Sequence, residues 1–164
     1  MNDATNAGKV ILHNIGAISV KLETYFDALA KERGFGISYN EWVLLSHVIE
    51  HSGKNQKWYA ENILKDKTTT MRVIDTLEKR GLILRVPDVH NRRQNLLRAT
   101  EKGEALIGTT LSFVNGAVAD LLRGIDRANL NAAVEVLERI GENMMSTAVD
   151  HKQIYGGNEW EKEE

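Results

Sequence analysis

Three consecutive segments between residues 55 and 100 constrain the fold more than any other part of the chain. A short helix is predicted first, then a second helix that starts after Asp66 and stops at Gly81, then two β-prone runs around a turn. The Asp66 carboxylate can accept hydrogen bonds from the unpaired N–H groups of a first helical turn, and glycine tolerates the left-handed conformation after a helix. This order predicts a helix-turn-helix followed by a β hairpin.

The predicted second helix has two faces of different chemistry. One face is apolar at helical spacing and is expected to pack on a core: Thr70, Val73, Ile74 and Leu77. The opposite face is short, polar and cationic: Lys67, Thr68, Thr69, Arg72, Thr76 and Lys79. Short hydroxyl side chains beside a long arginine suit close approach to base edges in a DNA major groove. Taken alone, such a face favours a solvated helix, and the next segment tips the balance.

The predicted hairpin follows directly and concentrates positive charge. Its strands are expected at 82–86 and 95–99, and the turn formers between them are Pro87, Asp88, His90 and Asn91. Its cations are Arg85, Arg92, Arg93 and Arg98. Residues 65–98 hold nine Lys or Arg against four Asp or Glu, a net of +5, whereas the rest of the chain holds twelve against nineteen, a net of −7. Arginines at a hairpin tip are often only exposed to solvent. Beside a helix that can enter a DNA major groove, however, they can neutralise phosphates or enter a minor groove.

Three runs of this region carry a recognisable pattern: DTLEKRGLILR at 75–85, DVHNRR at 88–93 and RATEKG at 98–103. They resemble the end of the recognition helix, the wing, and the start of the fifth helix in the MarR family of bacterial winged-helix transcriptional regulators. Two positions depart from that pattern. Asn91 stands where the family usually has an acidic residue before the paired arginines, and Ala99 stands where it has leucine. The resemblance implies a mainly α winged helix-turn-helix protein with a small β hairpin and long dimerisation helices.

Long amphipathic helices are predicted on both sides of this lobe. In 7–33, apolar residues recur every seven positions in two rows: Ile11, Ile18, Tyr25 and Ile15, Leu22, Leu29. In 100–125 the rows are Ile107, Val114, Leu121 and Leu111, Val118, Ile125. A third helix is expected over 127–149, with Leu130, Val134, Leu137, Ile140 and Met144 on one side. A monomer could bury these apolar rows, which we call the seams, against its own helices. We favour the intertwined homodimer that the resemblance implies, because two-fold proteins match palindromic half-sites.

The remaining start signals complete the domain plan. Ser38 and Glu41 form a capping box before a helix that reaches about Glu50, and Asn55 can cap the first helix of the helix-turn-helix. We therefore expect a helical dimerisation region at 1–36 and 101–150, a DNA-binding lobe at 37–100, and a mobile polar tail at 151–164.

Composition excludes several classes of protein. The absence of cysteine rules out disulfides, thiolate metal ligands and thiol-based oxidation sensing. No apolar run approaches the roughly 20 residues of a membrane span, and no secretory leader is visible in the first ten residues, so we expect a cytoplasmic protein with no membrane partner. No serine pairs with a plausible histidine and aspartate, and no glycine pattern cradles a phosphate, so we expect no catalytic residues and no cofactor.

Histidine and aromatic residues raise two further ligand classes, a metal ion and a small molecule, and each has a simpler alternative. His47 and His51 stand four residues apart and can share a helix face, but a histidine is also favoured at a helix C-terminus, and no third ligand can be assigned from the sequence. We therefore predict no metal. The resemblance implies a small-molecule effector pocket between the dimerising helices and the lobe, near His13, Tyr25, Trp42 and His47. Tyr25 and Trp42, each taken singly, are better explained as core aromatics.

The sequence thus predicts a homodimeric transcription regulator on a pseudo-palindromic double-stranded DNA operator. Thr68, Thr69 and Arg72, with Thr76 beside them, are expected at the bases, and Arg92 and Arg93 at the flanking minor groove or its phosphates. Lys57, Lys67 and Lys79 are expected on the DNA backbone. The alternative is a winged-helix module that contacts protein only. The clustered cations disfavour this alternative because protein interfaces are depleted in lysine.

Overall fold

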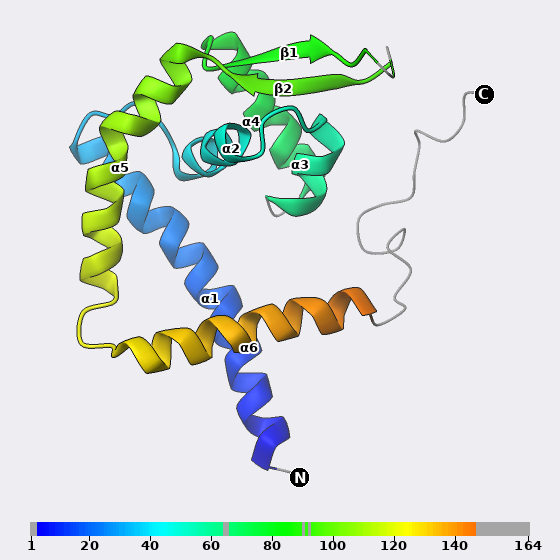
Figure 1. Ribbon diagram of the computed structural model, residues 1–164. Coiled ribbons are helices and arrows are strands. Elements are labelled where there is room, and N and C mark those ends of the chain that lie inside the picture. The colour runs from blue at the N-terminus through cyan, green and yellow to red at the C-terminus, as the bar shows by residue number, and fades with distance from the viewer. Residues whose placement is uncertain (1–2, 64–65, 90, 92, 147–164) are drawn as a thin grey trace. The chain divides into compact units, whose positions relative to one another are not determined.

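The computed structural model describes residues 3–63, 66–89, 91 and 93–146 (Figure 1). Along the chain the elements are α1 (Asp3–Glu32), α2 (Tyr39–Glu50), α3 (Gln56–Asn62), α4 (Lys67–Lys79), β1 (Ile83–Pro87), β2 (Asn95–Ala99), α5 (Glu101–Leu121) and α6 (Arg127–Ser146). The mainly α fold with one small hairpin is therefore confirmed. The chain divides between Thr110 and Leu111 into two compact units, which are described separately.

The core of the first unit is formed where α2, α3, α4 and the hairpin meet (Figure 1). Its fully buried members come from all of these elements: Leu44, Leu45, Val48, Tyr59, Ile74, Leu77, Ile83 and Leu97. The Tyr59 hydroxyl donates a hydrogen bond of 2.7 Å to the carbonyl oxygen of His51, so the one polar atom of this buried ring is satisfied. This shared core holds α4 at a fixed place on the lobe.

The predicted helix starts are confirmed by their hydrogen bonds. Ser38 and Glu41 form the expected reciprocal capping box before α2. Asn55 Oδ1 accepts from the backbone N–H of Trp58 at 2.9 Å before α3. Asp66 Oδ1 does the same for α4, accepting from the N–H of Thr69 at 2.7 Å. Each cap satisfies a backbone donor that the first helical turn leaves without a partner.

The end of α4 is fixed by Gly81, which adopts a φ of 68°. The N–H of Gly81 donates to the carbonyl of Glu78 (2.8 Å), and the N–H of Leu82 donates to the carbonyl of Leu77 (2.9 Å). These two bonds form a Schellman motif, whose left-handed residue is most often glycine. The chain leaves this turn directly into β1.

The hairpin is antiparallel, with Ile83 opposite Ala99, Arg85 opposite Leu97 and Pro87 opposite Asn95. β1 begins and ends one residue later than predicted. The turn before α3 adds to the sheet, since the N–H of Gly53 donates to Leu97 O at 3.0 Å and Lys54 O accepts from Leu97 N at 2.9 Å. These bonds tie the hairpin to the helix-turn-helix.

The long helices differ from their predicted bounds at the ends. α1 begins earlier than expected, at Asp3, and α5 ends at Leu121 rather than at 125. The reason for the early end is Gly124, whose φ of 82° stops the chain from continuing as a helix, and Asp126 then caps α6 through the N–H of Asn129 (2.9 Å). The last residues of the helix predicted at 127–149 and the whole predicted tail lie outside the described residues.

Most of the predicted seam residues remain exposed in the single chain. They are Ile11, Ile15 and Ile18 on α1, Leu111, Val118 and Leu121 on α5, and Val134, Leu137 and Met144 on α6, joined by Ile125. Among the described helices, none is long and apolar enough to cross a membrane.

Candidate nucleic-acid interface

The face of α4 opposite the core carries the polar side chains that were predicted there from helical periodicity. Thr70, Val73, Ile74 and Leu77 are buried, whereas Lys67, Thr68, Arg72 and Lys79 are exposed and Thr69 and Thr76 are half-buried. We call the six polar residues Lys67, Thr68, Thr69, Arg72, Thr76 and Lys79 the outer face of α4. Its polar surface is presented by a helix whose other side is fixed in the core.

Two threonines of this face already use their hydroxyl protons. Thr69 Oγ1 donates to Asp66 Oδ2 at 2.8 Å, and Thr76 Oγ1 donates to the carbonyl of Arg72 at 2.9 Å. The backbone N–H of Thr69, its hydroxyl and, more weakly, the charge of Arg72 hold the pKa of the Asp66 carboxyl below its ordinary value. Thr69 and Thr76 therefore offer an oxygen lone pair and a methyl group to a partner, which suits a base-edge donor or a thymine methyl.

The turn of the hairpin is closed by Asn91. Its Oδ1 accepts from the N–H of Arg93 at 3.1 Å, and its carbonyl accepts from the N–H of Gln94 at 2.9 Å. The N–H of Asp88 donates across the turn to the carbonyl of Gln94 at 3.0 Å. The carboxamide thus supplies a local acceptor at the position where the family pattern has an acidic residue. Arg93 is exposed at this turn, and His90 and Arg92 lie outside the described residues.

Two cations of the positively charged region serve the fold. The Arg85 guanidinium on β1 pairs with Asp75 and Glu78 on α4, and only 20% of its side chain is exposed. The Arg80 guanidinium lies 3.1 Å from Glu41 of α2 and donates to the carbonyl of Gly36 at 2.6 Å. The nine cations counted from the sequence in this region therefore overstate how many are available to a partner. Sequence reasoning missed these pairs because their members are brought together only by the fold.

Lys57 lies in the first turn of α3. Its Nζ is 3.9 Å from Glu61 Oε1, and both side chains are more than half exposed. An exposed pair at this separation contributes little and is screened by salt, so Lys57 is able to exchange this partner for a phosphate.

Three of the four residues predicted for an effector pocket have other contacts. Tyr25 packs edge-on against Phe26 (ring centroids 5.4 Å apart), and Trp42 Nε1 donates to Thr110 Oγ1 at 2.8 Å. His47 stacks on His51 at 5.7 Å, and burial is the main reason why its pKa is lowered. His13 is exposed on α1. Both aromatics thus have the partly buried, packed surroundings of structural residues.

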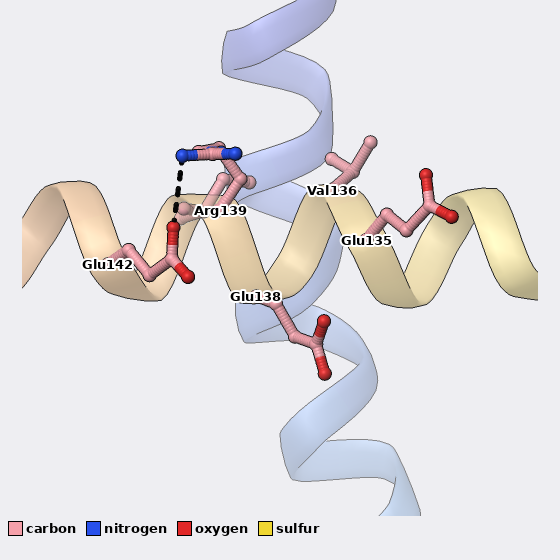
Figure 2. Close-up of a pocket in the computed structure, with 6 residues that line it drawn as sticks. Glu135, Val136, Glu138, Arg139 and Glu142 are labelled. Carbon is pink, nitrogen blue, oxygen red and sulfur yellow. Dashed lines mark ion pairs between the residues drawn. The ribbon is translucent and has the colours of Figure 1, made fainter.

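A shallow hollow lies on α6. Figure 2 shows that the side chains around it come from this one helix, and that the Arg139 guanidinium pairs with Glu142 at 3.1 Å. The full lining is Glu135, Val136, Glu138, Arg139, Ile140 and Glu142. A surface supplied by one helix cannot enclose a ligand on several sides, as small-molecule sites do, so we assign no function to it.

The three-helix lobe, its two-stranded wing and the polar outer face of α4 define a winged helix-turn-helix protein. Residues 37–94 match the model of the MarR family. Residues 37–94 therefore resemble the winged helix-turn-helix domain of that family. This is a family of transcription regulators and not of enzymes.

Solved structures agree over most of the chain. A MarR family transcriptional regulator from Listeria monocytogenes, complexed with 26mer DNA, is 28% identical with a TM-score of 0.71, over 81% of this chain and 87% of that one. The transcriptional regulator SlyA is 28% identical with a TM-score of 0.72, over 82% of this chain and 93% of its own. A MarR/EmrR family regulator from Acinetobacter sp. ADP1 has a TM-score of 0.75 over 88% of this chain and 99% of its own, and at 19% identity it supports the fold alone.

Proposed function

We propose that this protein regulates transcription as a homodimer that binds a pseudo-palindromic operator in double-stranded DNA. The observation that carries the proposal is the outer face of α4, which is polar and cationic while the opposite side of the same helix is buried. A helix held in this way can enter a major groove without disturbing the core. The similarity to a regulator that was crystallised with DNA supports this reading.

The contacts divide into those that read sequence and those that hold the backbone. Thr68, Thr69, Arg72 and Thr76 face the bases in this arrangement, and Lys57, Lys67 and Lys79 hold phosphates. Arg93, with Arg92 before it in the sequence, serves the flanking minor groove or its phosphates. Arg80 and Arg85 are left out of this set because carboxylates of the lobe already hold them.

The dimer is supported by the apolar seams of α1, α5 and α6, which are exposed in the single chain. An extended run of exposed apolar residues at seven-residue spacing is typical of a helix that packs on a partner. Two lobes related by a two-fold axis match two half-sites when their recognition helices lie roughly 34–36 Å apart, one turn of duplex.

Regulation follows from that spacing. A small-molecule effector that binds more tightly to a dimer with a different lobe separation shifts the population away from the DNA-binding state. His13, Tyr25, Trp42 and His47 remain the residues that we propose for contacts with such an effector.

Binding to a random-sequence duplex at several salt concentrations tests the proposal. We expect the affinity, measured by fluorescence anisotropy, to fall steeply as salt rises, because phosphate neutralisation releases condensed counterions. Lys67→Ala should lower the slope of log affinity against log salt by about 1. Arg139→Ala on α6 is the matched control and should leave the slope unchanged, since this residue lies outside the lobe. Weak binding that does not respond to salt would instead favour a winged helix that contacts protein only.

A further inference from the structure

We propose that His47, Glu50 and His51 form a binding site for a divalent transition-metal ion of the Zn²⁺ class at the carboxyl end of α2. One ligand atom from each residue lies within 4.8 Å of the others. The same carboxylate oxygen, Glu50 Oε2, lies 3.8 Å from His47 Nδ1 and 3.9 Å from His51 Nε2. The sequence offered two histidines without a third ligand, and the turn of the helix end supplies it.

The donor set matches the ion. Two imidazole nitrogens and one carboxylate oxygen hold Zn²⁺ in sites that keep a fourth position for water. Around a tetrahedral Zn²⁺ with bonds of about 2.0–2.1 Å, neighbouring donors lie about 3.4 Å apart. The observed separations from Glu50 Oε2 exceed this by a few tenths of an ångström. Glu50 can close them by rotating, because 67% of its side chain is exposed.

The surroundings hold the two histidines in place. Their rings are nearly parallel, with 9° between the planes and centroids 5.7 Å apart. The N–H of His51 donates to the carbonyl of His47 at 2.8 Å, and the carbonyl of His51 accepts from the buried Tyr59 hydroxyl at 2.7 Å. Two ligands on adjacent helical turns with a fixed backbone lose little conformational freedom when they bind an ion.

Two further observations favour a cation at this place. His47 Nδ1 is buried and has no hydrogen-bond partner among the described residues, which is unusual for a polar atom inside a protein. The cluster also lies in the last turn of α2 and at its C-cap, where the partial negative charge of the helix end attracts a positive ion. The simpler explanation is a pair of ordinary histidine–glutamate contacts, and the two explanations differ in what they predict for added metal.

Zn²⁺ competition separates them. The full chain, stripped of metal with EDTA, is titrated with Zn²⁺ in the presence of a chromophoric chelator. We expect one Zn²⁺ per chain. Glu50→Gln and His51→Gln should each weaken binding by at least about tenfold, since losing even a group that only supports a metal ligand costs about 10–100-fold. Glu138→Gln, at an exposed carboxylate of α6 that does not belong to the cluster, is the matched control and should bind as the wild type does.

A second readout makes the test independent of stoichiometry. The Trp58 ring lies 5.1 Å from the His51 ring, so metal at His51 should change the tryptophan fluorescence. Trp58→Phe should abolish that change while retaining the ion.

Glu50 is exposed, so its substitution tests the site even if His47→Gln destabilises the fold. Equal Zn²⁺ affinity in wild type, Glu50→Gln and His51→Gln, or no Zn²⁺ retained against the chelator, would overturn the site. Neither measurement uses DNA, so the result stands apart from the proposed operator binding.

Discussion

Asp66 is a single residue that links the stability of α4 to pH. Its pKa is lowered in the folded chain, chiefly by the N–H of Thr69, so folding favours the charged carboxylate. The stability that the cap contributes is therefore complete above the ordinary pKa of an unfolded aspartate. It is lost as the pH falls through the lowered folded value.

The corresponding prediction compares wild type with Asp66→Asn, because asparagine can cap the same helix but does not titrate. We expect the unfolding free energy of the wild type to fall more steeply between neutral pH and pH values below the ordinary aspartate pKa. Chemical denaturation across this range measures the difference. Parallel pH profiles for the two proteins would show that the cap does not depend on the carboxylate charge.

Gly103 shows how one missing side chain allows the first turn of α5 to approach Leu82, the residue before β1. A Cβ atom at this position would lie 2.3 Å from the carbonyl oxygen of Leu82, a backbone atom that cannot move away cheaply. The same carbonyl accepts the N–H of Thr100 at 3.1 Å, so a shift would also break the start of the helix. The reason for glycine here is the distance between two segments and not a special backbone angle.

Gly103→Ala should therefore destabilise the protein by about 1–3 kcal/mol, the usual range for overpacking. Gly108→Ala is the matched control in the same helix, since nothing lies within 4 Å of its added Cβ. That control should be neutral or stabilising by up to about 1 kcal/mol, because glycine weakens a helix interior. Similar unfolding free energies for both variants would contradict the close approach.

At the scale of elements, Arg85 joins the wing to the recognition helix. It lies on β1 and pairs with Asp75 and Glu78 on α4, so one guanidinium links the hairpin to the helix in addition to the shared core. Arg98, on the neighbouring strand β2, is exposed. The two arginines look alike in the sequence and differ only in what the fold brings to them.

Arg85→Ala should lower the unfolding free energy by about 1–2 kcal/mol, since a charged hydrogen bond contributes about 1.5–3 kcal/mol and the exposure of Asp75 reduces this. Arg98→Ala should change it by less than about 0.5 kcal/mol, as most surface substitutions do. Denaturant unfolding of both variants measures the contrast. Equal losses would mean that Arg85 contributes to the fold no more than a solvated cation.

These elements also show why some features follow from sequence and others do not. The starts of α2, α3 and α4 and the stop at Gly81 were predictable because caps and C-terminal glycines are encoded within a few neighbouring residues. The two faces of α4 follow from helical periodicity in the same way.

The partners of Arg80 and Arg85 could not be predicted, and neither could the role of Gly103, because each depends on how separate segments meet in space. Within the site, the exposed position of Arg72 followed from periodicity. The engagement of the Thr69 and Thr76 hydroxyls did not, because a side-chain rotamer decides it.

For the whole molecule, the exposed seams predict a dimer. Val118 on α5 is 39% exposed and belongs to a seven-residue row. Val118→Glu should convert a particle of twice 18.4 kDa into one of 18.4 kDa, as measured by light scattering after gel filtration, because a charge cannot be buried in an apolar seam without a partner. Val89→Glu, at a position that is 85% exposed in the hairpin, is the matched control and should leave the dimer intact. A wild-type mass of one chain would contradict the dimer.

Sequence readout by the outer face of α4 is tested most directly by comparing affinities for a selected operator and a random duplex at one salt concentration. Arg72→Ala should reduce the difference in binding free energy between the two duplexes by roughly 1–3 kcal/mol, because a bidentate base contact is lost. The double variant Arg92→Ala and Arg93→Ala should weaken both duplexes alike, and Arg139→Ala should weaken neither. An unchanged difference for Arg72→Ala, with α4 still folded, would show that this helix does not read DNA.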